Sequence, residues 1–290
     1  MNKLNENPTL PIHGVTGSTG INVLSLFDGM SCGQIALERV GIKVSDYFAS
    51  EIDKYAIQVT QKNYPNTKQI GSVVDVKGSE LPKIDLMYGG SPCQSFSRAG
   101  DGSGFDGSSK LFWEFVRVLK ETNPKYFLLE NVIMKKEWEI VITEALGVEP
   151  IEIVSSKFVP QNRRRLYWTN IPNVNQPNQV DYNVDDFFNG EGFPSACDMK
   201  RVFKEKKLFN TITATYYKGI RGSSRPAVST KEGFYDDDRD AHRMLTPNEC
   251  EALQTVPKDY TKCVSKTQRY KMLGNGWTVD VIAHIFKELI

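Results

Sequence analysis

Hydrophobic residues between positions 21 and 172 occur either in short continuous runs or at helical spacing. The runs are bounded by Gly, Pro or polar clusters, which predicts buried strands, whereas the apolar residues at 111, 112, 115, 116 and 119 share one helix face. Strands that alternate with helices predict an α/β fold with a mostly parallel sheet covered on both faces. The expected strands are 22–27, 45–50, 83–88, 126–129, 151–154 and 166–168, and the expected helices are 34–40, 54–63 and 111–121.

The composition divides the chain into an arm and two unequal domains. Residues 1–20 are rich in Asn, Thr, Pro and Gly and show no period, so we expect a flexible arm. Near Pro172 the composition shifts toward Asn and Asp. We therefore expect one large α/β domain formed by residues 21–172 and 265–290, and a small second domain formed by residues 173–264.

The small domain contains a local excess of basic residues. Residues 200–225 hold eight Lys and Arg against the single acid Glu205, with Phe203, Tyr216 and Tyr217 among them. A solvated surface is the simplest interpretation of such a run, but aromatic and hydroxyl groups among cations are typical of a groove that binds phosphates and bases. The whole chain has 36 Lys and Arg and 35 Asp and Glu, a net charge of +1, so any nucleic-acid surface must be local.

Several other classes of protein are not favoured by the sequence. The five cysteines include no Cys-x-x-Cys pair and there are three histidines, so we expect neither a disulfide scaffold nor a metal site. No run approaches the roughly 18 consecutive apolar residues of a membrane span. We therefore expect a reduced, cytoplasmic protein that works without a metal or a membrane.

The first strand, turn and helix predict a nucleotide-like ligand. Phe27-Asp-Gly29 follows the first expected strand, where such ligands bind doubly wound sheets. The turn lacks a full Gly-x-Gly-x-x-Gly pattern, so an adenosine cofactor without a pyrophosphate fits better than a dinucleotide. Glu51 and Asp75 are placed to end the next two strands and to accept hydrogen bonds from ribose hydroxyls and a base amine. A merely structural loop is the alternative interpretation.

Three reactive groups follow later strands. Cys93 lies in Gly89-Gly-Ser-Pro-Cys-Gln94, just past the strand 83–88, and Glu130 follows the strand 126–129. In Gln161-Asn-Arg-Arg-Arg165 the side chains of residues 161, 163 and 165 would project together from one face. Each group also has an ordinary interpretation: a buried thiol, a helix cap or salt bridge, and a solvated basic strand. Together they place a thiol, a carboxyl group and guanidinium groups at one sheet edge.

The combination of these motifs and their order resemble the cytosine-C5 DNA methyltransferase family. The resemblance covers nearly the whole chain, from Asn22 to Ile290. The chain is identified as a member by motifs that follow in the family's order. They are Phe27-Asp-Gly29, Glu51, Asp75, Ser91-Pro-Cys-Gln94, Glu130-Asn-Val132, Gln161-x-Arg163-x-Arg165, Arg243-Met-Leu-Thr-Pro-Asn-Glu249 with Leu253-Gln254, and Gly274-Asn-Gly-Trp-Thr-Val279.

The resemblance implies a covalent mechanism. The thiolate of Cys93 would add to C6 of cytosine and Glu130 would protonate or hydrogen-bond N3, so that C5 can attack the methyl group of S-adenosylmethionine. Arg163 and Arg165 would hold the base and position Glu130. The cytosine must first be flipped out of the duplex, and the glycine-rich stretch 94–109 is expected to be a mobile lid, poorly ordered without DNA.

The resemblance also assigns the ligand contacts. Phe27 would contact the sulfonium side of the cofactor, Asp28 and Gly29 its methionine moiety, Glu51 the ribose and Asp75 the adenine amine. Further residues expected at the cofactor are Ile52, Val76, Pro92, Leu111, Asn275 and Trp277. Residues expected to bind double-stranded DNA are Gln94, Ser95, Arg98, Gln161, Thr211, Lys218, Arg221 and Arg225. A monomer is expected, with a dimer left open.

The sequence departs from the usual bacterial pattern in its subclass features. Phe27-Asp-Gly-Met-Ser-Cys-Gly33 and Asn275-Gly-Trp-Thr are similar to the de novo type of DNA methyltransferase, whereas the motifs around 161–165 and 243–249 look bacterial or phage-like. The small domain would be the target-recognition domain, with base readout by the loop 217–225, but no code predicts the sequence that it recognises.

Three alternatives stay open at this point. One is a transfer RNA methyltransferase on the same scaffold, and another is a catalytically silent DNA-binding homologue. Gln94 after Pro92-Cys93 favours DNA over RNA, and the intact Cys93, Glu130, Arg163 and Arg165 disfavour a silent homologue. A dehydrogenase is the weakest alternative, because the phosphate-binding turn is missing.

Overall fold

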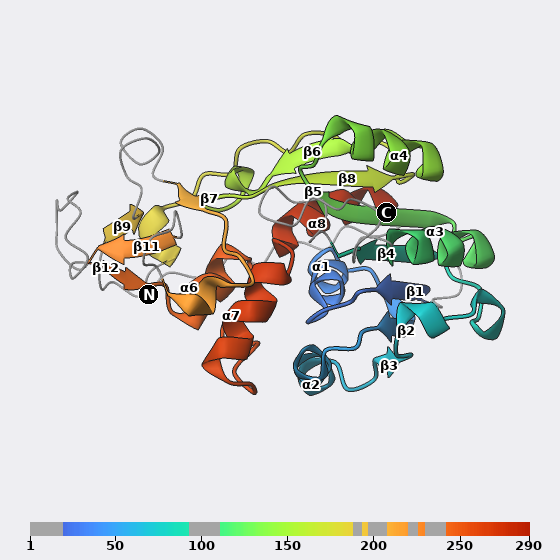
Figure 1. The fold of residues 1–290 in the computed structure, drawn as a ribbon, viewed down its shortest axis with the longest axis horizontal. Coiled ribbons are helices and arrows are strands. Elements are labelled where there is room, and N and C mark those ends of the chain that lie inside the picture. Colours follow the sequence, from blue (N-terminus) through green and yellow to red (C-terminus); the bar gives the residue numbers. More distant parts are fainter. Residues whose placement is uncertain (1–19, 93–110, 188–192, 197–207, 220–225, 230–241) are drawn as a thin grey trace.

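A computed structural model describes residues 20–92, 111–187, 193–196, 208–219, 226–229 and 242–290 of the chain. The predicted N-terminal arm, residues 1–20, lies outside these ranges except for Gly20. The predicted lid, residues 94–109, lies wholly outside them. The predicted helix 54–63 and strand 151–154 have the same bounds in the structure, and the predicted strand 45–50 and helix 111–121 differ from it by one residue at one end. The large sheet is the main feature of the described part (Figure 1).

Seven strands form the large sheet in the order β3-β2-β1-β4-β5-β8-β6. The first five strands in this order pair in parallel, whereas β8 pairs antiparallel with both β5 and β6. This confirms the predicted α/β class with its mostly parallel sheet. The strands are β1 (Ile21–Leu26), β2 (Val44–Ser50), β3 (Lys68–Gln69), β4 (Leu86–Gly90), β5 (Tyr126–Val132), β6 (Ile151–Val154) and β8 (Arg164–Thr169).

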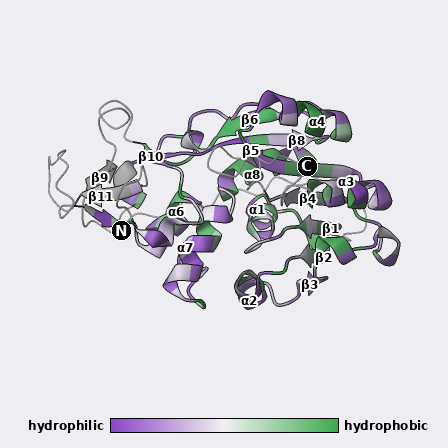
Figure 2. Ribbon diagram, in the orientation of Figure 1, coloured by the Kyte–Doolittle hydropathy of each residue, from purple (hydrophilic) through white to green (hydrophobic). Residues whose placement is uncertain are grey.

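Helices cover both faces of this sheet, and each face has its own core. Along β1, Val23 belongs to one core whereas Leu24 and Leu26 belong to the other, because successive strand side chains point to opposite faces. In Figure 2, α3 and α4 carry both hydrophobic and hydrophilic residues, as expected for helices with one buried face. The first core includes residues of α1 (Cys32–Arg39), α2 (Lys54–Asn63), α7 (Lys266–Asn275) and α8 (Val279–Phe286), and the second those of α3 (Leu111–Thr122) and α4 (Lys136–Leu146).

Local sequence signals explain where two of the helices begin. The side chain of Asp53 accepts a hydrogen bond from the backbone N–H of Tyr55 and caps α2. The helix α6 (Pro247–Leu253) begins with a capping box between Thr246 and Glu249 and has Pro247 in its first turn. Glu249 also forms an ion pair with Arg243 at 2.8 Å. These contacts give the Arg243–Glu249 motif a structural role.

Two smaller sheets lie apart from the large one. A three-stranded antiparallel sheet has the order β12-β11-β9, and the short strands β10 and β7 pair in parallel. In Figure 1 the three-stranded sheet lies at the end of the molecule away from α3 and α4. The strands are β7 (Gln161–Asn162), β9 (Phe193–Ala196), β10 (Phe209–Asn210), β11 (Pro226–Ser229) and β12 (His242–Met244).

The chain contacts the large domain again earlier than the predicted boundary at residue 265. The hydroxyl of Tyr260 donates to the carbonyl oxygen of Met30 at 2.8 Å, and Asn63 donates to the carbonyl oxygen of Tyr260 at 3.0 Å. Leu245 and Leu253 are fully buried in the first core. Contacts across the fold, which composition does not reveal, thus connect residues 245–264 to the large domain.

Candidate active site

One continuous cavity of about 370 Å³ opens at the carboxyl ends of β1, β2, β4 and β5, where ligands meet such sheets. Its volume lies within the range of small-molecule sites. Most of the predicted cofactor and catalytic residues among the described ones line it together. They are Phe27, Asp28, Gly29, Glu51, Ile52, Pro92, Leu111, Glu130, Arg163, Arg165, Asn275 and Trp277.

Glu51 is held in place at the end of β2 by three backbone N–H groups. Its Oε2 accepts from Gly29 at 2.7 Å, and its Oε1 accepts from Ile52 and Asp53 at 2.7 and 2.8 Å. A carboxylate offers about four lone-pair positions, so a fixed acceptor remains for one further donor. This geometry suits a ribose hydroxyl.

Asp28 lies on the same wall with both carboxylate oxygens engaged. It accepts hydrogen bonds from the hydroxyl of Tyr47 at 2.6 Å and from that of Ser31. Burial raises the pKa of Asp28 to about 6; hydrogen bonds from hydroxyls, including those of Ser31 and Tyr47, oppose the shift, and the charge of Glu51 adds to it. Asp28 therefore changes charge just below neutral pH.

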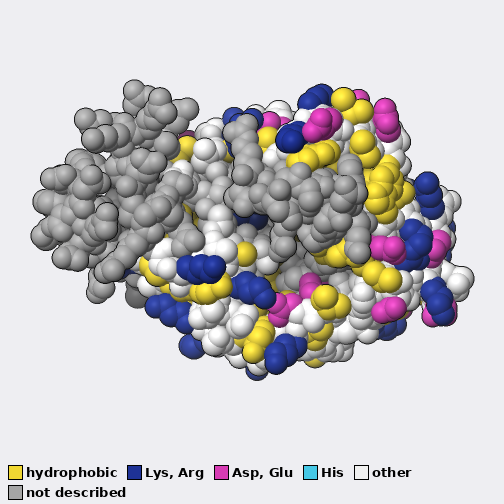
Figure 3. Space-filling model, in the orientation of Figure 1, with side chains coloured by type: hydrophobic (Ala, Val, Ile, Leu, Met, Phe, Trp, Pro, Cys, Tyr) yellow, Lys and Arg dark blue, Asp and Glu magenta, His cyan; other side chains and the backbone are white. Residues whose placement is uncertain are grey.

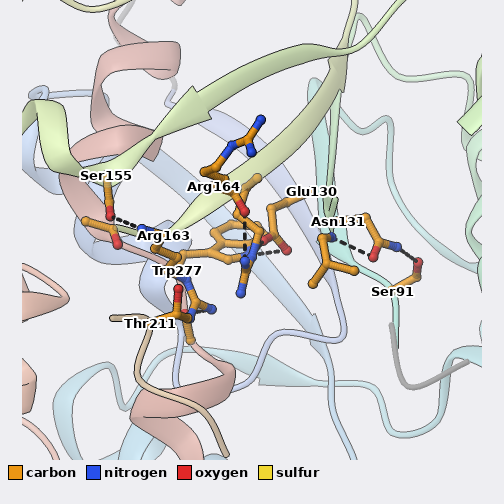
Figure 4. Close-up of polar contacts among 12 residues, drawn as sticks. Ser91, Glu130, Asn131, Ser155, Arg163, Arg164, Thr211 and Trp277 are labelled. Atoms are coloured by element: carbon orange, nitrogen blue, oxygen red, sulfur yellow. Dashed lines mark hydrogen bonds and ion pairs between the residues drawn. The ribbon is translucent and has the colours of Figure 1, made fainter. Parts of the chain in front are cut away.

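Glu130 is held by two donors from different parts of the chain. Its Oε1 lies 2.8 Å from Nε of Arg165. Its Oε2 accepts from the indole N–H of Trp277 at 3.1 Å, and Figure 4 shows these two residues side by side. The Glu130 and Arg165 side chains are only 10% and 14% exposed, so solvent screens this pair little. The carboxyl group thus has a fixed orientation at the cavity wall.

The acid motif is connected to the segment that precedes Cys93. The side-chain amide of Asn131 donates to the hydroxyl of Ser91 at 3.1 Å, and both residues are buried (Figure 4). Ser91 and Pro92 line the cavity. Cys93 follows Pro92 directly in the sequence and lies outside the described residues, as do the predicted DNA contacts Gln94, Ser95 and Arg98.

The side chains of Gln161, Arg163 and Arg165 point inward whereas those of Asn162 and Arg164 are exposed, which agrees with the predicted common face, but Gln161 does not have the predicted access to DNA. Gln161 is fully buried and donates to the carbonyl oxygen of Leu253 at 2.9 Å, so its side chain is not exposed to DNA here. Its Oε1 accepts from the backbone N–H of Ile212 at 3.1 Å. A buried amide must find such partners, and Gln161 finds them by joining separate segments.

Arg163 lies at the cavity wall, as predicted, and its guanidinium group also binds the backbone. Its guanidinium donates to the carbonyl oxygens of Ile212 and Gly276 at 3.1 and 2.9 Å, and to that of Gly274 at 3.3 Å. It therefore orders the backbone next to Trp277. Arg165, for its part, forms an ion pair with Glu130.

Asp75 does not end a strand, which corrects the prediction. The strand β3 ends at Gln69, and Asp75 is exposed in a 3-10 turn, Val73–Asp75. The neighbouring Ser72 and Val73 line the cavity, whereas the predicted Asp75 and Val76 lie outside its wall. The run Ser72-Val-Val-Asp75 resembles a strand, but its backbone turns after the short edge strand.

Sequence reasoning missed a contact that crosses the cavity from α7 to the start of α2. Nζ of Lys271 lies 3.0 Å from Oδ2 of Asp53, and Lys271, Asp53 and Gln268 all line the cavity. Burial alone would raise the pKa of Asp53, but Lys271 and the N–H of Tyr55 outweigh it and lower that pKa. The three-residue spacing of Gln268 and Lys271 on one helix face was a usable signal.

Two of the small-domain residues that were predicted to contact DNA lie within the described part of the chain. Lys218 is exposed, and Thr211 is half-buried with its hydroxyl donating to the carbonyl oxygen of Asn162 at 2.8 Å. Next to Lys218, Tyr216 is fully buried and donates to the carbonyl oxygen of Pro226 at 2.6 Å, which fixes the turn. Arg221 and Arg225 lie outside the described residues.

Lysines lie on the α7 side of the cavity. Lys262, Lys266 and Lys271 are exposed, and Figure 3 shows Lys and Arg side chains on the surface over α6 and α7. Within the described ranges no helix is long and apolar enough to cross a membrane. The same ranges contain no group of three His, Cys, Asp or Glu side chains placed to hold a metal ion.

Known proteins resemble this chain over nearly all of its length. The sequence matches the C-5 cytosine-specific DNA methylase family over residues 21–206 and 189–290. Type II methyltransferase M1.ScrFI of Lactococcus lactis subsp. cremoris is 28% identical over 317 residues, 92% of this chain and 77% of that protein. Type II methyltransferase M.NlaX of Neisseria lactamica is 27% identical, over 92% of this chain and 95% of that protein.

A solved structure shows the same fold. The methyltransferase EhMeth of Entamoeba histolytica superposes with a TM-score of 0.75 at 19% identity, over 94% of this chain and 100% of that chain. At this identity the likeness concerns the fold alone.

Proposed function

Since this chain belongs to the C-5 cytosine-specific DNA methylase family, we propose that the cavity at the carboxyl edge of its sheet is where the methyl transfer takes place. The chain is a DNA cytosine-5 methyltransferase that uses S-adenosylmethionine. The observation that carries the assignment of the site is the placement of Glu130, with its two donors, in the same cavity as the fixed carboxylate of Glu51.

The cofactor supplies an electrophilic methyl group when it is bound. Glu51 would accept a hydrogen bond from its ribose, Asp28 would face its positive charge, and Phe27, Ile52 and Leu111 would contact its apolar parts. The donor set supports this assignment because the three backbone N–H groups on Glu51 hold an acceptor ready without filling all its lone pairs.

On the base side, we assign the chemistry to Cys93, Glu130 and Arg165. The Cys93 thiolate adds to C6 of a flipped-out cytosine, forming a carbon–sulfur bond. Glu130 gives a proton or a hydrogen bond to N3 and so takes up the charge that develops as the bond forms. Arg165 keeps the carboxyl group of Glu130 in place. After methyl transfer, loss of the C5 proton allows β-elimination and frees Cys93.

Transfer of a labelled methyl group from S-adenosylmethionine to mixed duplex DNA, and in parallel to transfer RNA, tests this function. We expect label in DNA at one recurrent cytosine context, which base-resolution mapping would reveal together with the recognition sequence. Label only in RNA would keep the chemistry and change the substrate. Label in neither would contradict the proposed function and favour a silent DNA-binding homologue.

We further propose that duplex DNA is the substrate and that the small domain, with Lys218 beside the buried anchor Tyr216, contacts it. The bacterial relatives M1.ScrFI and M.NlaX support an enzyme of the prokaryotic cytoplasm, and the phage-like motifs noted above leave a phage enzyme as the other possibility. A monomer would suffice, because a single chain contributes all the cavity residues named above.

The affinity for S-adenosylmethionine is expected to fall as the pH decreases through about 6. Above this pKa Asp28 is ionised and attracts the positively charged cofactor, whereas below it the carboxyl group is neutral. We expect the Kd to rise about tenfold between pH 7.5 and pH 5, a loss of about 1.4 kcal/mol. Titration calorimetry across this pH range would measure the Kd. An Asp28→Asn variant should bind weakly at all these pH values, and an unchanged pH dependence in that variant would contradict the role of Asp28.

Replacing Lys218 with Ala is expected to weaken DNA binding and to reduce its salt dependence. One lost phosphate contact lowers the slope of log K against log salt by about 0.9. Fluorescence anisotropy with a labelled duplex at several salt concentrations would measure the slope. Lys83→Ala, at an exposed lysine before β4, is the matched control. A slope equal to that of the unmodified protein would place the DNA surface elsewhere.

A further inference from the structure

Trp277 contacts the catalytic acid in addition to lining the cavity. Its indole N–H donates to Oε2 of Glu130 at 3.1 Å (Figure 4). Nε of Arg165 lies 2.8 Å from Oε1. Among the described residues, each oxygen of the carboxyl group thus has one donor and keeps another lone pair. The two donors fix the plane of the group and leave it able to meet a base.

The neighbouring strand is shaped to allow this contact. Gly90 on β4 pairs with Glu130 on β5. A Cβ atom at Gly90 would lie 3.0 Å from Oε2 of Glu130 and 3.1 Å from Nε1 of Trp277, closer than nearly all ordinary Cβ contacts. A side chain at this position would press on both partners of the hydrogen bond. The glycine is therefore explained by the approach of Glu130 and Trp277.

Tyr88 and hydrogen bonds to the preceding backbone fix the position of the indole ring. Its ring centroid lies 5.8 Å from that of Tyr88, which is fully buried. Arg163 and Gln254 donate to the carbonyl oxygen of Gly276 at 2.9 and 3.3 Å, and Gln254 also donates to that of Leu273 at 2.7 Å. An apolar contact alone would not require a particular orientation of the indole ring. A hydrogen bond from its N–H does, because hydrogen bonds depend on direction.

We propose that Trp277 is a positioning residue for Glu130 in the methyl transfer reaction. It holds Oε2 through its N–H, while Arg165 holds Oε1, and Gly90 provides the space for this arrangement. The indole N–H is a donor only, so it orients the carboxyl group without competing for the proton that Glu130 gives to the base. The inference rests on the proposed function of the cavity and adds a residue that acts through Glu130.

Two variants that act on the same hydrogen bond test the proposal. Trp277→Phe removes the N–H and keeps an aromatic ring, and Gly90→Ala inserts a methyl group beside it. We expect each to lower kcat about tenfold or more, with the Kd for S-adenosylmethionine within about threefold of the unmodified protein. The loss should appear in kcat and not in cofactor binding, because the hydrogen bond acts on Glu130. A merely structural defect at the cavity wall would weaken cofactor binding as well.

The matched control is Trp138→Phe on α4, which makes the same substitution outside the cavity and should leave kcat unchanged. Cofactor binding measured by calorimetry shows that each variant is folded. If Trp277→Phe has the kcat of the unmodified protein, or loses only cofactor affinity, the positioning role is wrong. If the unmodified protein transfers no methyl group to nucleic acid, the proposed function itself has failed.

Discussion

A Cys93→Ser variant is expected to transfer no measurable methyl group while binding duplex DNA with nearly unchanged affinity. The reaction needs a thiolate to add to C6, and a serine hydroxyl stays protonated and is a far weaker nucleophile near neutral pH. DNA affinity, in contrast, comes mainly from contacts to phosphates, which this substitution leaves in place. Labelled methyl transfer and fluorescence anisotropy on the same duplex would measure the two quantities.

The covalent step can be tested apart from turnover. A duplex with 5-fluorocytosine at the target position cannot lose a proton from C5, so the Cys93 adduct should persist after denaturation. We expect a trapped complex with the unmodified protein and none with Cys93→Ser. Cys263→Ser, at an exposed free cysteine, is the matched control and should retain activity and trapping. Retained methyl transfer by Cys93→Ser would overturn the mechanism.

The large sheet could be predicted because its signals are local. The helix 54–63 and the strand 151–154 have the predicted bounds, since a cap at Asp53 and the nearby Pro65 limit the first and a short apolar run defines the second. Because the strands are parallel, their carboxyl ends share one edge. Glu51 and Glu130 were therefore expected at one site, and both line the cavity.

The details of the site depend on contacts between distant residues, which no local pattern reveals. Glu130 and Trp277 are 147 residues apart in the sequence, and their hydrogen bond depends on the packing of α7 and α8 against the sheet. Gln161 was expected to contact DNA, and Arg163 was expected to hold the base and to position Glu130. In the structure both side chains are buried, and they donate hydrogen bonds to backbone carbonyl groups of residue 212 and of the segment 253–276. Buried carbonyl groups need such donors.

Asp75 shows a different limit of sequence reasoning. The run Ser72-Val-Val-Asp75 has the β-branched composition of a strand, yet the structure has a 3-10 turn there, started by the side chain of Ser72. Serine side chains that bond to nearby backbone N–H groups compete with strand pairing. The edge position next to the two-residue strand β3 leaves few ladder bonds to oppose this turn.

Glu130→Gln is expected to lower kcat by about 10²- to 10⁴-fold, the usual contribution of a positioned acid or base. The amide keeps the size of the side chain and can still accept from Trp277, but it cannot give a proton to N3. It also leaves Arg165, which is only 14% exposed, without its anionic partner. Single-turnover methyl transfer would separate this loss in chemistry from any change in DNA affinity.

The same substitution on β6, two strands away from β5 in the sheet, provides the control. Glu152 pairs with Arg164 at 2.6 Å, but these side chains are 35% and 54% exposed, so the pair is solvated and contributes little. Glu152→Gln should therefore leave kcat within about twofold of the unmodified protein. If Glu130→Gln behaved like Glu152→Gln, the buried ion pair with Arg165 would be structural only, and the acid that activates the cytosine would have to be another group.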